Sequence, residues 1–182
     1  MKILVKSLLL CATFFAAANV VLAQSSDALP VPGIAPARDV PGAQLLPDPN
    51  VMHKVVFDVV NAAPAVDEVN PWLPAIARYV NTLADHGVPA ENRQIAVVFH
   101  QGSTPVILKN DEYKARNDGV DNPNIDLIRS LANAGVKFHV CGQAVLGRDI
   151  DPETIQPEIQ LDLWALTTLI DLQLDGYVLI GG

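Results

Sequence analysis

The sequence has little cysteine and a shortage of positive charge. Only two of its 182 residues are cysteine, and 12 basic residues face 20 acidic ones, for a formal net charge of −8. Because nucleic acids and anionic membranes attract cationic surfaces, this charge argues against both as partners. The chain also has no phosphate-binding loop, no dinucleotide glycine motif, no metalloprotease histidine pair and no Gly-x-Ser-x-Gly elbow. Those absences exclude the function classes that such motifs identify.

The first 23 residues have the pattern of a cleavable secretory signal peptide. Lys2 and Lys6 precede an apolar run, and the segment ends at Ala23, before the polar Gln24. Asn19 interrupts the run, which is shorter than the roughly 20 residues that span a bilayer, so cleavage is favoured over an uncleaved anchor. We therefore predict cleavage after Ala23 and a periplasmic mature protein.

Removal of this segment would leave Cys141 as the one cysteine of the mature chain. Lipoprotein attachment at Cys11 is a weaker alternative, because the preceding leucines lack the small residue of lipoprotein signals. Residues 1–23 contain two lysines and no acid, so their loss takes the net charge from −8 to −10. A single cysteine permits no intramolecular disulfide, so stability must come from a packed core. No later run is long enough to cross a membrane, and we expect no membrane insertion after cleavage.

Residues 24–52 are predicted to form a proline-rich linker or arm. The segment holds six of the chain's 14 prolines and shows no helical or strand period. It is either a passive spacer or an arm that wraps a neighbouring subunit. The spacer is favoured because such a composition tends to be disordered.

Residues 53–182 are predicted to form one α/β domain, a three-layer α/β/α sandwich of the flavodoxin-like class with a mostly parallel five-stranded sheet. Short β-branched runs alternate here with amphipathic helices. Asn70 and Asn122 are predicted helix caps, each followed by a proline at the first helical position. The predicted strands cover 54–60, 94–100, 136–141, 159–161 and 177–180, and the predicted helices 70–86, 110–116, 122–134 and 163–174. Open parallel sheets bind ligands beyond the carboxyl ends of their strands, which directs attention to residues 100–102 and 141–143.

Cys141 ends the third predicted strand, where Gly142 leads into a helix-compatible stretch. The positive end of such a helix favours a thiolate, which is the nucleophilic form. Free cysteines are also among the most buried residues, so position alone leaves a purely structural role open. Alternation along the strand places His139 on the face of Cys141, and His100 ends the preceding strand.

The side chains at these strand ends fit two kinds of site. Gln101 and Gln143 could hydrogen-bond an oxyanion or a persulfide sulfur, while Gly102 and Gly142 belong to the same turns and glycine lets the backbone approach a bound anion. Alternatively, His100, His139 and Cys141 could form a soft site for Cu(I) or zinc. A metal would need these three ligands, drawn from two strand ends, to meet in one coordination geometry, and the sequence pattern does not indicate that they do. We therefore predict no resident metal and no cofactor.

Several segments of the domain resemble the DsrE/DsrF-like family. They are Val98-Phe99-His100-Gln101-Gly102, Asn122-Pro123-Asn124, Ala134-Gly135-Val136, Val140-Cys141-Gly142-Gln143 and Leu172-Gln173-Leu174-Asp175-Gly176-Tyr177. The resemblance covers about residues 53–182. It implies a DsrE-like fold, a sulfur-handling cysteine at Cys141 that carries persulfide and passes sulfur between proteins, and in several members a trimer or hexamer.

Three hypotheses follow from the sequence. The favoured one is a periplasmic sulfur carrier, sulfurtransferase-like, whose partner is a small sulfur compound or a sulfur-donor or sulfur-acceptor protein. The alternatives are a non-catalytic module that binds a small ligand or a soft metal in the same pocket, and an oligomeric structural protein with a buried cysteine. A homo-oligomer is expected from the resemblance and from the long arm.

Overall fold

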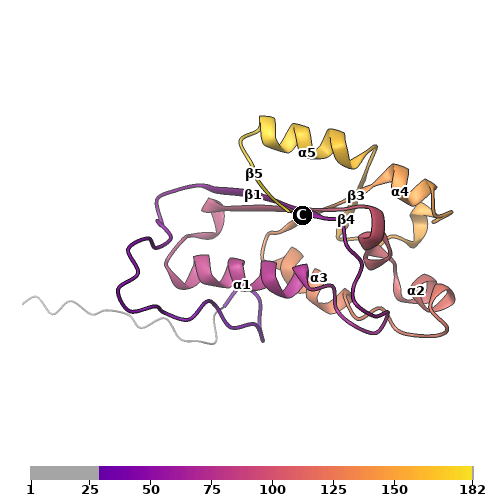
Figure 1. Ribbon diagram of the computed structural model, residues 1–182, viewed down its shortest axis with the longest axis horizontal. Coiled ribbons are helices and arrows are strands. Elements are labelled where there is room, and N and C mark those ends of the chain that lie inside the picture. The colour runs from indigo at the N-terminus through magenta and orange to yellow at the C-terminus, as the bar shows by residue number, and fades with distance from the viewer. Residues whose placement is uncertain (1–28, 182) are drawn as a thin grey trace, which may run out of the picture.

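The protein was analysed as a computed structural model that describes residues 29–181 (Figure 1). Its centre is one five-stranded sheet in the order β4-β3-β2-β1-β5, with every pairing parallel. The strands are β1 (His53–Val59), β2 (Arg93–Phe99), β3 (Lys137–Cys141), β4 (Ile159–Asp162) and β5 (Val178–Gly181). The predicted α/β sandwich is confirmed, with a sheet that is wholly rather than mostly parallel. The predicted signal peptide lies outside the described residues.

Helices cover both faces of the sheet, as the alternation of strands and helices requires. Figure 1 shows α1 and α3 on one face and α5 on the other. The α-helices are α1 (Trp72–Asp85), α2 (Asn110–Arg116), α3 (Ile125–Asn133), α4 (Gly142–Leu146) and α5 (Ala165–Leu174), and the 3-10 helices are η2 (Ala90–Asn92), η3 (Gln101–Ile107) and η4 (Pro152–Thr154). Within residues 29–181, none of these helices combines the length and apolar character needed to cross a membrane.

The core is divided unequally by the sheet. The larger part lies against α1 and α3, where the rings of Phe99 and Phe138 stack with centroids 5.9 Å apart. The smaller part lies under α5 and contains Val56, Val98 and Cys141. Cys141 therefore belongs to the thinly covered face, where side chains at the carboxyl ends of the strands have room for a pocket.

Helix α1 begins one residue later than predicted. Its first residue is Trp72, and Pro71 occupies the capping position. The predicted contribution of Asn70 is still present, because its Oδ1 accepts a hydrogen bond from the Trp72 N–H at 3.1 Å. A side-chain oxygen in that position satisfies one of the donors that a helix start leaves without a partner.

Helix α3 begins three residues after its predicted cap. The side chain of Asn122 donates hydrogen bonds to the carbonyls of Val106 and Leu108, at 3.0 and 2.7 Å, and accepts one from the Asn124 N–H at 3.0 Å. Asn122 thus fastens the loop to the end of η3, and the helix starts at Ile125. The sequence predicted a loop and an undefined stretch where η3 lies. The contact of η3 with Asn122 joins residues far apart in the chain, so no local sequence pattern indicates it.

The described part of the proline-rich segment begins by packing against α1. Val31 is fully buried in the main core, and its N–H and carbonyl both bond to the side chain of Asn81, at 2.9 and 2.8 Å. Asn81, itself fully buried, also donates to the Ile34 carbonyl at 2.7 Å. Farther along, the Ala37 N–H donates to Thr82. This part of the segment is therefore attached to its own domain.

Candidate functional site

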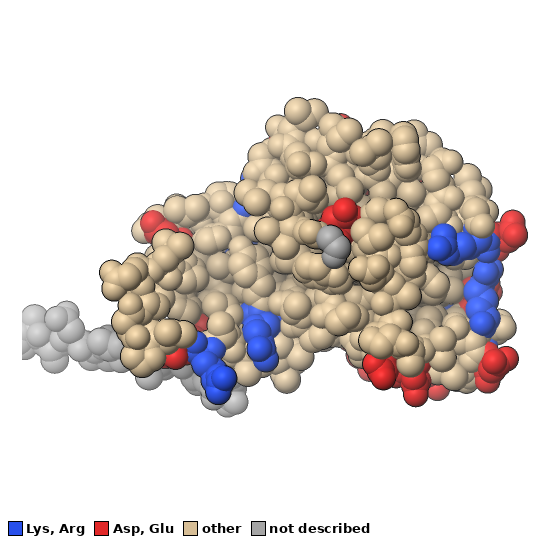
Figure 2. Space-filling model, viewed as in Figure 1, with Lys and Arg blue, Asp and Glu red and all other residues tan. Residues whose placement is uncertain are grey.

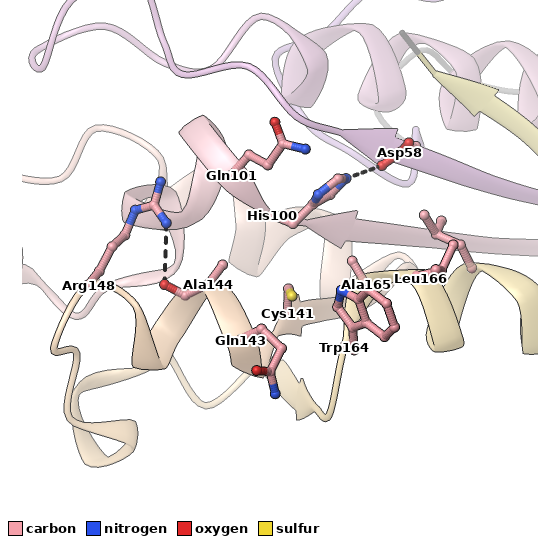
Figure 3. Close-up of a pocket in the computed structure, with 11 residues that line it drawn as sticks. Asp58, His100, Gln101, Cys141, Gln143, Ala144, Arg148, Trp164, Ala165 and Leu166 are labelled. Carbon is pink, nitrogen blue, oxygen red and sulfur yellow. Dashed lines mark hydrogen bonds and ion pairs between the residues drawn. The ribbon is translucent and has the colours of Figure 1, made fainter.

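A pocket of about 590 Å³ opens at the carboxyl ends of the strands, on the face covered by α5 (Figure 3). Cys141, only 4 % exposed, forms part of its wall. The other lining residues are Asp58, His100, Gln101, Gln143, Ala144, Arg148, Trp164, Ala165, Leu166 and Leu169. They come from β1, from the ends of β2 and β3, from α4 and the turn after it, and from α5. The pocket thus occupies the expected place for a ligand on an open parallel sheet.

The strand register places two polar residues beside Cys141. Strands β2 and β3 pair Phe99 with Val140, so the next residues, His100 and Cys141, are neighbours on adjacent strands. On the other side, β4 pairs Asp162 with Cys141. Adjacent strands lie about 4.8 Å apart, which makes both residues immediate neighbours of the cysteine.

His100 forms a close pair with Asp58 inside the pocket. Its Nε2 lies 2.6 Å from Asp58 Oδ1, and both side chains are largely buried. Gly181 of β5 leaves room for Asp58, since a Cβ there would lie 2.6 Å from the Asp58 Cβ and 2.9 Å from the Asp58 carbonyl oxygen. The end of the edge strand is therefore shaped around Asp58.

His139 shares the sheet face of Cys141, as predicted, but lines a separate pocket of about 560 Å³. Its Nδ1 lies 2.8 Å from Asp162 Oδ2, which also accepts from Thr168 at 2.9 Å. The Nε2 of His139 is buried and has no hydrogen-bond partner among the described residues. The alternation of residues along a strand predicts the sheet face on which a side chain lies, but it does not predict toward which neighbouring strand the ring points.

The two histidines do not combine with Cys141 into a metal site. Each imidazole pairs with a different aspartate, on a different side of the cysteine. Across the part of the chain that the structure describes, no cluster of three or more His, Cys, Asp or Glu side chains could hold a metal ion.

Gly102 and Gly142 make close contacts with other parts of the protein. A Cβ on Gly142 would lie 2.5 Å from the carbonyl oxygen of Asp162, so only glycine lets α4 start this close to β4. A Cβ on Gly102 would lie 3.0 Å from the backbone nitrogen of Ala62. Neither glycine lines the Cys141 pocket, and Gly102 lines a smaller hollow beside the loop that follows β1.

Further polar groups that line the pocket come from the segments after β2 and β3, namely η3 and α4 with the turn that follows it. Gln101 has a φ of 50°, a left-handed conformation that is costly for a residue with a side chain and is often found at functional sites. Gln143 donates through its amide to the Leu163 carbonyl at 3.2 Å. Arg148 lies in the turn after α4 and donates to the Ala144 carbonyl at 3.3 Å. Arg148 is the one cation that lines the pocket, and it forms no ion pair with any described residue.

Besides small and aliphatic side chains, sequence reasoning missed three lining residues that can bind or orient a ligand: Asp58, Arg148 and Trp164. Asp58 is the one charged residue in the apolar run that follows Lys54 in β1, a pattern that could have identified it. Arg148 and Trp164 lie outside the strand ends on which the sequence argument relied. Only the folded chain brings them to the cysteine.

Comparison with known proteins supports this fold. A family model described as the DsrE/DsrF-like family matches residues 54–181. Among solved structures, the chain is similar to one described as a protein of unknown function, MTH1491, from Methanobacterium thermoautotrophicum. The two are 17% identical with a TM-score of 0.50, and the similarity covers 71% of this chain and 99% of that one. At this identity the likeness concerns the fold alone. No match to the chain was found among curated proteins.

Proposed function

This chain belongs to the DsrE/DsrF-like family, and we propose that it is an exported sulfur-handling protein that carries a sulfane sulfur on Cys141. Membership in the family suggests a function of the sulfur-relay type. The observation that carries the proposal is the composition of one pocket, in which a cysteine, a paired histidine and an arginine share about 590 Å³. The pattern of the first 23 residues supports export.

The proposed reaction is a simple sulfur transfer. The thiolate of Cys141 attacks the terminal sulfur of a polysulfide or persulfide, and a new S–S bond forms. The donor's own S–S bond breaks, and the rest of the donor leaves with the electron pair, as a thiolate from a persulfide or as a shorter sulfide anion from a polysulfide. The product is a persulfide on Cys141, a reversible modification that a second thiol can remove.

The pocket is suited to an anionic donor because of Arg148. The guanidinium of Arg148 is free of carboxylate partners within the described chain, and hydrogen bonds that involve a charged group contribute about 1.5–3 kcal/mol. Trp164, Leu166 and Leu169 supply an apolar wall that suits the polarisable sulfur chain. These features favour a small anionic sulfur compound over a neutral one.

Replacing Arg148 with glutamine is expected to slow sulfur loading by about tenfold, which corresponds to about 1.4 kcal/mol. The rate of persulfide formation with inorganic polysulfide would be followed by mass spectrometry. Reaction of the same variant with neutral iodoacetamide should stay close to the wild-type rate, because that reagent carries no charge for Arg148 to attract.

Arg129→Gln is the matched control, since it removes the same charge from an exposed position on α3. It should leave both rates unchanged. Equal slowing in Arg129→Gln and Arg148→Gln, or no slowing in Arg148→Gln, would contradict a local anion site.

We further propose that the protein associates with copies of itself through α5. Exposed apolar side chains run along the outer side of this helix and onto β5, and we call them the α5 stripe. Each is at least 41 % exposed, and they are Leu163, Leu166, Ile170, Leu174 and Leu179. Figure 2 shows few charged side chains over this region. A surface of this kind usually marks an interaction site. Because the chain is strongly acidic elsewhere, copies would repel except where charge is absent.

A charge placed in the α5 stripe is expected to break this association. For Ile170→Glu we predict a mass near that of one chain by light scattering, whereas the wild type gives a multiple. Ala75→Glu, which places the same charge on an exposed position of α1, should behave like the wild type. A monomeric wild type at micromolar concentration would refute the proposal.

A further inference from the structure

Two aspartate–histidine pairs flank Cys141, and they differ in what they face. Asp58 and His100 line the pocket of the cysteine. Asp162 and His139 line the neighbouring pocket on the other side. Both pairs are short, at 2.6 and 2.8 Å, and both are largely shielded from solvent. Their unequal placement suggests unequal roles.

His100 is held in an orientation that suits proton exchange. It continues β2 in an extended conformation, with its N–H bonded to the Val59 carbonyl, and this continuation sets it beside Cys141. Its Nε2 is bonded to Asp58, and its ring approaches the Ser103 N–H at the start of η3 without forming a hydrogen bond, so Nδ1 is the nitrogen left to take a proton. Figure 3 shows the His100 ring between Asp58 and the end of β3.

The other groups around the thiol are less suited to accept its proton. The carboxylate of Asp162 already receives hydrogen bonds from His139, Thr168 and Gln160. His139 has its free nitrogen buried, and the cation Arg148 has no proton-accepting atom. Together with Asp58, these are the charged or titratable side chains of the described chain that lie beside Cys141 or His100 on β1, β3, β4 and the turn after α4. Two further groups lie on the same sheet face: Asp171 of α5 lines the pocket of His139, and Tyr177 belongs to the apolar cluster of Cys141.

We propose that His100 is the catalytic residue that accepts the proton of the Cys141 thiol, and that Asp58 is the positioning residue that holds it. The inference rests on the proposed function of Cys141. The proton moves from Sγ to His100 Nδ1, and the thiolate forms an S–S bond with the donor's terminal sulfur. The donor's S–S bond breaks, and its remaining thiolate leaves with the electron pair and takes the proton back from His100.

This transfer does not require a direct contact in the free protein. No hydrogen bond joins His100 to Cys141 among the described residues, and such bonds often form only after substrate binds or through one water molecule. The carboxylate of Asp58 binds Nε2 and so leaves Nδ1 as the nitrogen that accepts a proton, as an orienting acid does for a catalytic histidine.

The test is the pH dependence of Cys141 alkylation by iodoacetamide in the mature chain. For His100→Gln we expect the rate at about pH 7 to fall tenfold or more and to meet the wild-type rate at about pH 10, where a thiol ionises without help. Asp58→Asn should show a smaller loss with the same pH trend. His139→Gln is the matched control and should keep the wild-type profile, and urea unfolding would show that each variant is folded.

The outcomes separate this inference from the proposed function. A wild-type pH profile of alkylation in a folded His100→Gln would overturn the role of His100. An equal loss of alkylation rate in His139→Gln would overturn it as well. If His100→Gln does not fold, Asp58→Asn decides in the same way. Cys141 that resists iodoacetamide at every pH also overturns the assignment. If the profile shifts as expected but no persulfide forms, the role of His100 stands and the sulfur-carrier proposal fails.

Discussion

Replacing Cys141 with serine is expected to abolish sulfur loading of the mature chain completely. Cys141 is the one cysteine that remains after the predicted cleavage, so no other thiol can take its place. A hydroxyl has nearly the shape of the thiol but does not form a persulfide. The measurement is the mass of the protein after incubation with polysulfide, which should rise by one sulfur atom in the wild type and stay constant in the variant.

The stability of the variant must be checked, because Cys141 contacts an apolar part of the core. An unpaired hydroxyl there costs about 1–3 kcal/mol, so Cys141→Ala serves as the second variant. Both should keep the wild-type fold by circular dichroism. Sulfur uptake by either folded variant would mean that another group carries the sulfur.

Replacing Asn81 with alanine is expected to lower the free energy of unfolding by about 2–4 kcal/mol. The amide of Asn81 is fully buried and makes three hydrogen bonds to the backbone of Val31 and Ile34. Alanine would leave those backbone groups without partners and would also loosen Val31 from the core. Urea unfolding with an unchanged m-value would measure the loss.

Thr82→Ala is the control for this prediction. Thr82 is the next residue of α1 and binds the same segment through the Ala37 N–H, but the bond is exposed to solvent. Its loss should cost about 1 kcal/mol or less. Equal stability of Asn81→Ala and the wild type would show that the docked segment contributes little.

The sheet and the place of Cys141 could be predicted because they depend on local pattern. Apolar runs and alternating residues along 136–141 are enough to define a strand, its faces and its carboxyl end. The resemblance to one family was carried by short motifs in the same region. These predictions needed no knowledge of which strands are neighbours.

The pairing of the polar residues could not be predicted, because it depends on strand order and register. Asp58 precedes His100 by 42 positions, and only the adjacency of β1 and β2 brings them together. His139 was predicted to act with Cys141, yet its ring turns toward Asp162 on β4. The docking of Val31 was hidden for the same reason, since a proline-rich composition carries no signal for one buried contact.

A reactive Cys141 and a structural Cys141 predict different behaviour of the thiol. Burial of Cys141 fits a packing role, whereas its pocket with His100 and Arg148 fits chemistry. The two accounts differ in whether the thiol reacts with an anionic sulfur donor.

The most direct test is the intact and peptide mass of the protein recovered without reductant from the periplasm of cells that express the full chain. The account predicts a chain that begins at Gln24 and carries one added sulfur atom on Cys141, which dithiothreitol removes and polysulfide restores. A Cys141 thiol that stays unmodified in the cell and after polysulfide treatment, under conditions that persulfidate a free cysteine peptide, would contradict it.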